Sequence, residues 1–344
     1  MKKAMIASLL LAVLAANMSA QLTFSGDVYI GIQFDIPYGT HTWETASINA
    51  EHPKEGSPRL NLVGTAMREN FGARFDATFQ HTTSPADRFS LNGVYGWATF
   101  LDNSLRFTMG QISSAVWVSS LDRDHEFYFD AVRGFRIEYN TPIQGLSVGT
   151  AFRTNEHSFE TFFKQMIFGA SFIHPQFNTV IAYDLGGNAN LLFGFNYTGI
   201  PDLEAGIQIM ANHLASWDSA VVGGILQFNQ RVGYRLRPFG VAHPLDISLV
   251  AGQTFFGAEG RDIDLVFTPS VSYRILPNLT GIFSTEFFFT PADFETTRVI
   301  TLNPRLEYML RGPAFLYFGY ELRLARYKVD SHHRISFGIE IRAF

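Results

Sequence analysis

The chain has 344 residues, contains no cysteine, and carries 26 basic against 31 acidic residues, a formal net charge of −5. The lack of cysteine excludes a disulfide framework and a thiolate metal site, and the negative charge disfavours nucleic acid as a partner. Phenylalanine is abundant, with 34 residues, although the mean hydropathy is only +0.05. A soluble fold would have to bury these rings, whereas a membrane barrel can turn them toward lipid around a polar interior.

Residues 1–20 form the first predicted element. Lys2 and Lys3 precede an apolar run at residues 4–16, and the small residue Ala20 stands directly before Gln21. This pattern predicts a secretory signal peptide that is removed on export. An N-terminal membrane anchor is the alternative, but the apolar run is shorter than the ~20 residues that a spanning helix needs. We expect residues 21–344 to form a single domain.

After residue 20, no apolar run is long enough for a membrane helix, and apolar side chains instead recur at every second position. Because successive side chains of a strand point to opposite faces, this pattern predicts strands with one apolar and one polar face. In chain order, the clearest of these segments are residues 22–35, 71–80, 262–274, 316–324 and 332–344.

The lengths and the apolar side chains of these predicted strands indicate the architecture. A soluble β-sandwich shows the same alternation and is the alternative fold. However, segments of about ten residues follow one another without helical patterns between them, as the strands of a membrane barrel do. Their apolar faces are rich in Phe, Tyr and Leu rather than in the Val and Ile typical of a sandwich core. We therefore predict an all-β fold, a transmembrane antiparallel up-and-down β-barrel that the last segment closes.

The connections between the predicted strands fall into two classes. Longer, polar connections lie at residues 37–58, 82–90, 113–130 and 155–163. Short turns on one side of a barrel and longer loops on the other are typical of outer-membrane barrels. Eight turns indicate eighteen strands, and sixteen is the alternative because residues 219–237 are ambiguous. The short, turn-rich connections lie at residues 69–70, 102–103, 141–145, 174–177, 199–202, 238–244, 276–278 and 311–313.

One stretch, residues 106–148, combines several recognisable features. A strand that ends in Gly110-Gln111 leads into a loop of eighteen residues at 113–130, and the next strand ends in Tyr139-Asn140-Thr141-Pro142 before a Gly145-Leu146 hairpin. This stretch resembles the general porins of Gram-negative outer membranes. The resemblance implies a water-filled channel for passive diffusion of small hydrophilic solutes and ions, placed in outer-membrane lipid and assembled as a homotrimer. It also implies that the third loop folds into the barrel.

In such porins the third loop narrows the channel. Acidic residues of the loop would then face basic side chains of the wall, and opposed charges in a water-filled constriction set the ion preference. The alternative is that these are solvated wall residues without a special role. The predicted pore-constriction residues are Asp122, Asp124, Glu126 and Asp130 in the loop, and Arg74, Asp76, Arg106, Arg136 and Glu138 in the wall.

The sequence has no His-Glu-x-x-His, no phosphate-binding loop and no EF-hand spacing. Residues 145–149 have the spacing Gly-x-Ser-x-Gly, but they follow a predicted turn and do not lead into a helical pattern, which the catalytic form of this motif requires. We predict no enzymatic activity, no cofactor and no metal. The adjacent His332 and His333 precede the last strand and are expected to point to opposite faces.

Two other functions remain open from the sequence. A transporter of hydrophobic compounds of the fatty-acid type needs an N-terminal plug, and the first predicted strand begins too close to the signal peptide to leave room for one. A surface adhesin or structural barrel would use long outer loops such as residues 37–58 to bind a partner.

Overall fold

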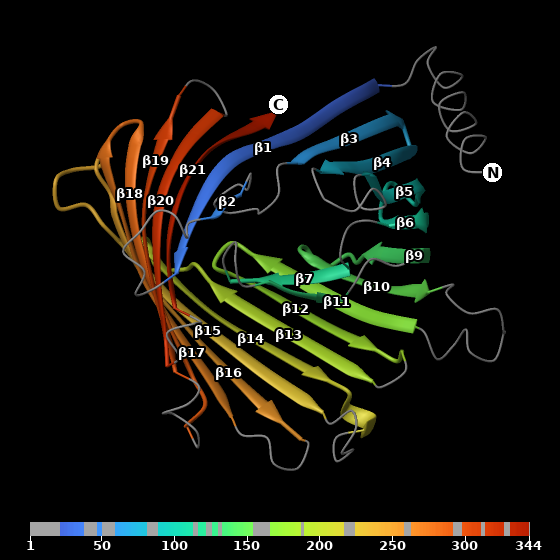
Figure 1. Ribbon diagram of the computed structural model, residues 1–344. Coiled ribbons are helices and arrows are strands. Elements are labelled where there is room, and N and C mark those ends of the chain that lie inside the picture. The colour runs from blue at the N-terminus through green and yellow to red at the C-terminus, as the bar shows by residue number, and fades with distance from the viewer. Residues whose placement is uncertain are drawn as a thin grey trace.

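The structure, a computed structural model, describes residues 21–37, 47–49, 59–80, 89–112, 116–121, 126–129, 133–153, 166–186, 189–216, 224–257, 263–291, 298–310, 314–326 and 331–343. The predicted signal peptide lies outside these residues. Eighteen long strands form one closed antiparallel sheet, in which each strand pairs with its neighbours in the chain and the first strand also pairs with the last (Figure 1). The predicted all-β barrel and its count of eighteen strands are confirmed.

The strands of the barrel are β1 (Gln21–Pro37), β3 (Arg59–Arg68), β4 (Phe71–Gln80), β5 (Phe89–Phe100), β6 (Leu105–Gln111), β9 (Arg133–Asn140), β10 (Leu146–Arg153), β11 (Met166–His174), β12 (Phe177–Asp184), β13 (Asn190–Tyr197), β14 (Leu203–Asn212), β15 (Ile225–Leu236), β16 (Leu245–Phe256), β17 (Asp264–Leu276), β18 (Leu279–Phe289), β19 (Val299–Met309), β20 (Ala314–Ala325) and β21 (His332–Ala343).

Among the residues that the structure describes, three further strands lie in the connections, together with one turn of 3-10 helix, η5 (Leu214–Ser216). Strand β2 (Ser47–Asn49) pairs with the end of β1. Strands β7 (Val116–Ser120) and β8 (Glu126–Phe129) pair only with each other among the described strands and form a separate hairpin, the inner hairpin. None of the helices in the described part of the chain is long and apolar enough to span a membrane.

The short turns lie where the sequence predicts them, each between two paired strands of the barrel. Seven of the eight fall within the described residues, and residues 311–313 fall outside them, between the paired strands β19 and β20. Glu69, Asp102 and Asn103 adopt positive φ angles of 44°, 52° and 67°. Such left-handed conformations reverse the chain within two to four residues. Because β1 begins and β21 ends beside these turns, both ends of the barrel sequence lie at the turn end.

The outer face of the barrel is apolar and exposed. Phe24 on β1 and Phe318 on β20 are 62% and 53% exposed, and exposed large apolar side chains also occur at alternate positions in β12, β15 and β16. Soluble monomers rarely expose a contiguous apolar surface beyond a few hundred Å². An apolar band that runs around a closed barrel is the surface expected for contact with hydrocarbon.

Tyrosines mark one border of this band. Five strands that run toward the turn end carry a tyrosine on the outer face within three residues of their last residue. Aromatic rings with a polar hydroxyl favour the boundary between hydrocarbon and headgroups, so this ring of side chains is typical of an interfacial girdle. The five are Tyr139, Tyr197, Tyr234, Tyr273 and Tyr308.

The inner face is polar, and its charges are arranged in pairs. An Arg-x-acid pattern on one strand places both side chains on the inner face, since residues two apart point the same way. In each case the ion pair forms within the strand: Arg74 with Asp76 at 3.8 Å, Arg136 with Glu138 at 2.9 Å, and Arg305 with Glu307 at 3.0 Å. Much of the positive charge that the sequence predicts for the wall is therefore neutralised locally.

Polar contacts on the inner face also join the last strand, β21, to both of its neighbours, β1 and β20. Arg334 on β21 donates to Asp35 on β1, with 2.7 Å between Nε and Oδ1. Glu340 on β21 is fully buried, and its carboxylate accepts a hydrogen bond from the hydroxyl of Tyr317 on the neighbouring β20. The closing strand thus carries a buried carboxylate that depends on a hydrogen-bond donor from β20.

Tyr317→Phe is expected to lower the free energy of unfolding by about 1.5–3 kcal/mol, because it removes a hydrogen bond to a buried charged group. Urea unfolding of the barrel in lipid vesicles measures the change. Tyr320→Phe on the same strand is the matched control, since the Tyr320 hydroxyl bonds to His333, 2.6 Å away, outside this carboxylate site. An equal loss in both variants would show that the Glu340 carboxylate has no special part in closing the barrel.

Candidate functional site

Strands β6 and β9 bring three of the predicted constriction residues together on the inner wall. Arg106 lies directly opposite Glu138 in the pairing of these strands, and Arg136 lies opposite Thr108 on the next inward step. The guanidinium of Arg106 stacks over the ring of Trp97 on β5, 4.9 Å from its centroid. Arg136 is mostly buried and is held in its ion pair with Glu138. These side chains form one charged patch on the inner wall, near the turn end of β6 and β9.

Arg74 and Asp76 face the same interior from β4, two strands away from Arg106 along the sheet. Their ion pair is longer than that of Arg136 and Glu138, and Arg74 is the more exposed of the two partners. Of the four predicted acidic residues of the loop, Asp122, Asp124 and Asp130 lie outside the described residues. Glu126 begins strand β8, but its side chain also lies outside what the structure describes.

The described part of the predicted third loop is the inner hairpin, and Figure 1 draws its strand β7 within the ring of barrel strands. Inward side chains of three strands hold its backbone. Gln208 on β14 donates to the carbonyl of Ser119 at 2.6 Å, and Asn196 on β13 donates to the carbonyl of Ser120 at 2.7 Å. Arg231 on β15 donates to the carbonyl of Leu121. The hairpin is therefore fixed to the inner wall over β13 to β15.

Glycines in the wall give the inner hairpin room to approach. A Cβ at Gly169 on β11 would lie 2.0 Å from Cδ2 of Trp117, and one at Gly194 on β13 would lie 1.9 Å from Oγ of Ser119. A larger residue at either position would need the space that the hairpin occupies. These glycines are thus required by close approach of a second backbone, a known reason for glycine inside a strand.

An apolar cluster lies under the same hairpin, on the face of the sheet that is otherwise polar. Side chains of β10 to β13 pack against Phe129 of β8, with Trp117 and Phe127 at the edge of the cluster. Burial of these rings stabilises the docked hairpin, at about 25 cal/mol for each Å² of apolar surface removed from water. The wall residues of the cluster are Ala151, Ile167, Val180, Ala182 and Leu192.

Sequence reasoning missed this docking surface, although a signal for it exists. Where inner and outer faces are both covered, a strand loses its alternation. Leu191, Leu192 and Phe193 are consecutive apolar residues, and Ile167 and Phe168 are another such pair. Continuous apolar runs in β11 and β13 therefore mark where the wall is covered on both sides.

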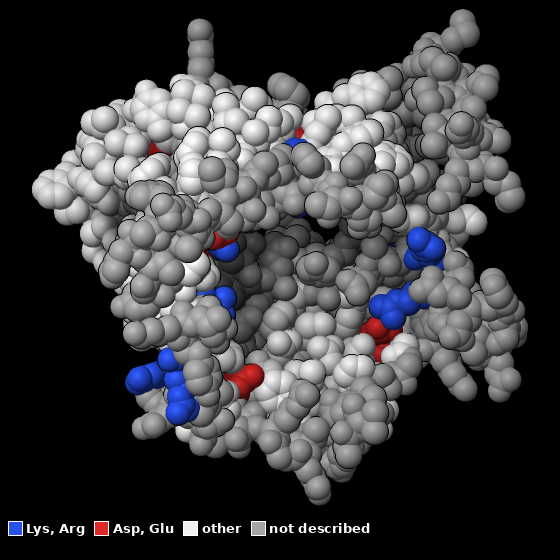
Figure 2. Space-filling model, viewed as in Figure 1, with Lys and Arg blue, Asp and Glu red and all other residues white. Residues whose placement is uncertain are grey.

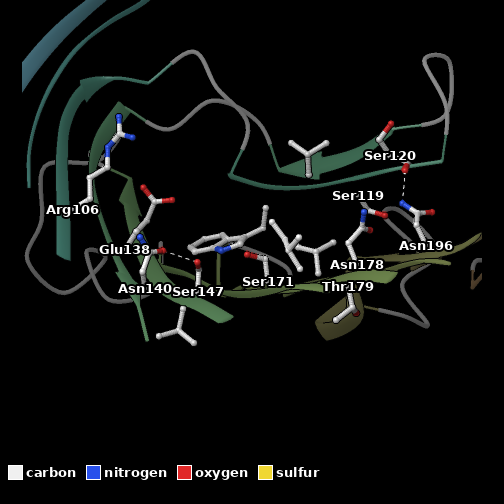
Figure 3. A pocket seen from close by; sticks show the side chains of 15 residues that line it. Arg106, Ser119, Ser120, Glu138, Asn140, Ser147, Ser171, Asn178, Thr179 and Asn196 are labelled. Carbon is white, nitrogen blue, oxygen red and sulfur yellow. Dashed lines mark hydrogen bonds between the residues drawn. The ribbon is translucent and has the colours of Figure 1, made fainter. Parts of the chain in front are cut away.

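A cavity of about 500 Å³ remains between β7 and the wall, on the side toward the turn end. Figure 3 shows Arg106 and Glu138 at one end of this cavity, Asn196 at the other, and β7 above the floor made by the barrel strands. Its lining combines uncharged polar side chains with apolar ones, which are Trp117, Val118, Val148, Ile173 and Val180. The labelled polar residues are Arg106, Ser119, Ser120, Glu138, Asn140, Ser147, Ser171, Asn178, Thr179 and Asn196.

Figure 2 shows a depression in the middle of the face turned to the viewer, with basic and acidic side chains of described residues beside it. The described residues contain no cluster of three or more side chains that could hold a metal ion. His332 and His333 lie within β21 rather than before it; His332 contacts Glu321 and His333 contacts Tyr320.

No protein-family model and no curated protein sequence matches the chain. Solved structures do match, with low sequence identity over nearly the whole chain. OccAB3 of Acinetobacter baumannii has a TM-score of 0.58 and 11% identity, and covers 94% of this chain and 99% of its own. An anion-selective porin from Comamonas acidovorans has a TM-score of 0.57 and 11% identity, over 95% of this chain and all of its own.

A third similar structure is Wzi of Escherichia coli, described as a carbohydrate-binding β-barrel of the outer membrane that takes part in group 1 capsule assembly. Its TM-score is 0.56 at 14% identity, over 97% of this chain and 86% of its own. The fold is that of outer-membrane barrels. At these identities the likeness concerns the fold alone, and the function has to be argued from the residues.

Proposed function

We propose that the protein is a porin of the outer membrane, in which a water-filled barrel lets small hydrophilic solutes and ions diffuse passively. The observation that carries the proposal is the separation of side chains on one closed sheet, with exposed apolar residues outside and paired charges inside. Barrels of sixteen to eighteen strands leave an aqueous channel, whereas eight-stranded barrels fill with side chains. The similar structures include porins, which agrees with this function.

The signal peptide predicted at residues 1–20 and the tyrosines at the border of the apolar band support placement in the outer membrane. The proposal includes no catalytic step, no cofactor and no nucleic-acid partner. Outer-membrane lipid contacts the apolar band, small hydrophilic solutes occupy the interior, and assembly as a homotrimer follows from the resemblance to general porins.

Single-channel recording in planar lipid bilayers tests the proposal. A stable open conductance from the purified protein is expected. A folded barrel without measurable conductance would favour the structural or adhesin function, and rescue of fatty-acid uptake in a deficient strain would favour a transporter of hydrophobic compounds.

We further propose that the inner hairpin and its connections form the constriction, with Asp122, Asp124, Glu126 and Asp130 opposite the charged patch of the wall. The hydrogen bonds and apolar contacts that hold β7 against β11 to β15 support this placement. Opposed charges across a narrow, water-filled passage select ions by sign.

Neutralising Asp122, Asp124 and Glu126 together, to Asn, Asn and Gln, is expected to shift ion selectivity toward anions. Removing three negative charges from the passage lowers the local concentration of cations. The reversal potential in a tenfold KCl gradient measures the shift. Neutralising Glu44, Glu51 and Glu55 of the 37–58 loop to Gln is the matched control, and an equal shift in both variants would remove the acidic residues from the constriction.

A further inference from the structure

The cavity under β7 has the size of a small-molecule site. Its volume of about 500 Å³ lies within the range of roughly 300–1,000 Å³ that is usual for ligand pockets. Strand β7 forms the roof of the cavity and is held against the barrel strands by hydrogen bonds. The side chains of Asn196 and Gln208 donate to the carbonyls of Ser120 and Ser119. A cavity with a fixed roof and floor presents its polar groups in a constant geometry.

One end of the cavity offers a cation. The described residues place no carboxylate within ion-pair distance of Arg106, whereas Glu138, beside it in the lining, is already paired with Arg136. Stacking on Trp97 orients the guanidinium plane and leaves its N–H groups available along the edge. A guanidinium in this state matches the two oxygens of a carboxylate or phosphate.

The rest of the cavity offers neutral hydrogen-bonding groups. Within the part of the chain that the structure describes, no hydrogen bond is seen for the amide of Asn178 or the hydroxyl of Ser171, and both line the cavity. An amide and a hydroxyl can each donate and accept, which suits sugar hydroxyls. Trp117 adds aromatic surface to the same lining, and an aromatic ring packs against the apolar C–H groups of a sugar.

We propose that this cavity is a binding subsite for a hydroxylated solute with a single anionic group, of the size of an acidic monosaccharide. Arg106 binds the anionic group, and Ser171 and Asn178 bind hydroxyls along the floor. The subsite would give the channel a preferred solute class, and in this respect the inference rests on the proposed porin function. Binding to the subsite, however, can be measured without a conducting channel.

Equilibrium binding to the folded protein in detergent tests the subsite without requiring conductance. Saturation-transfer NMR titrations with D-glucuronate and with D-glucose compare an acidic and a neutral sugar of similar shape. Glucuronate is expected to bind at least about tenfold more tightly than glucose, since a hydrogen-bonded charge pair adds at least that factor. Glucose binding as tightly as glucuronate would overturn the assignment.

Arg106→Gln is expected to weaken glucuronate binding about tenfold or more and to leave glucose binding unchanged. Arg274→Gln is the matched control, because Arg274 is an exposed inner-face arginine on the distant strand β17. Asn178→Leu is a second variant, expected to weaken both sugars. Unchanged glucuronate binding in Arg106→Gln would refute the subsite, and so would an equal loss of binding in Arg274→Gln. If the protein binds glucuronate as expected but shows no conductance in planar bilayers, only the proposed channel is refuted.

Discussion

Gly169→Val is expected to release the inner hairpin from the barrel wall and to raise the single-channel conductance. The new Cβ would lie 2.0 Å from Cδ2 of Trp117, so the valine and the indole ring cannot occupy their present places together. Displacing the ring breaks up the apolar cluster that Trp117 shares with Phe129 and Ile167. Loss of a large aromatic from a packed site costs roughly 3–5 kcal/mol, about as much as the three hydrogen bonds from wall side chains to the hairpin carbonyls contribute together.

The barrel itself is expected to survive this substitution. Gly169 lies in the paired strand β11, where a β-branched residue is compatible with the extended backbone. The substitution therefore lowers the free energy that holds the hairpin against the wall, and not the stability of the eighteen-stranded sheet. Faster proteolysis of residues 113–130, with an unchanged shift in mobility between heated and unheated samples on a gel, would report this separation.

Gly233→Val is the matched control for the conductance measurement. Gly233 faces the same interior from β15, but the nearest atom to a new Cβ there is Cβ of Ser248 at 3.6 Å, an ordinary contact. If Gly169→Val conducts like Gly233→Val and like the unchanged protein, the inner hairpin does not limit the flow of ions.

The barrel could be predicted from the sequence because its strongest determinant is a repeating local pattern. Alternation of apolar and polar residues sets which face of a strand meets lipid, and the eight turn-rich connections set the number of strands. Strand β1 illustrates this: Val28, Ile30 and Ile32 face outward and Tyr29 and Gln33 face inward, as their positions require. The ends of the strands were less accurate; the predicted segment 316–324, for example, is longer at both ends, as β20 at Ala314–Ala325.

The inner side could be predicted only in part, because its organisation depends on contacts between residues distant in the chain. The alternation correctly places Arg106, Arg136 and Glu138 on one face. It contains no information on which strands contact each other across the interior, nor that Trp97 of β5 would hold Arg106 of β6. Such contacts depend on strand register, and register depends on the whole sheet.

The docking surface of the inner hairpin was missed because it reverses the expected pattern. Ile167 and Leu192 are apolar on a face that should be polar, and Gly169 and Gly194 look like mere weak points in their strands. The residue types at these positions are explained only by the inner hairpin that packs on them. A loop that folds back onto a wall leaves its trace in the wall sequence, as small and apolar residues at inward positions of neighbouring strands.

Phe283→Arg is expected to destabilise the barrel by about 2–4 kcal/mol in a lipid bilayer, and Ser284→Arg to change its stability little. The two residues are neighbours near the middle of β18, so they share depth, backbone and pairing. Phe283 belongs to the outer face and is 47% exposed, whereas Ser284 lies on the inner face, paired with Ser270 and Asn303. An arginine at the outer position would meet hydrocarbon near the membrane midplane, which costs about that amount in barrel proteins.

Reversible unfolding by guanidinium chloride in phosphatidylcholine vesicles measures both free energies, and the same titration in short-chain detergent serves as the control. The difference between the two variants should shrink in detergent, because a micelle lets a charged group reach water more easily than a bilayer does. If both arginines were tolerated equally in vesicles, the outer band would not contact hydrocarbon and the proposed channel would lose its physical basis.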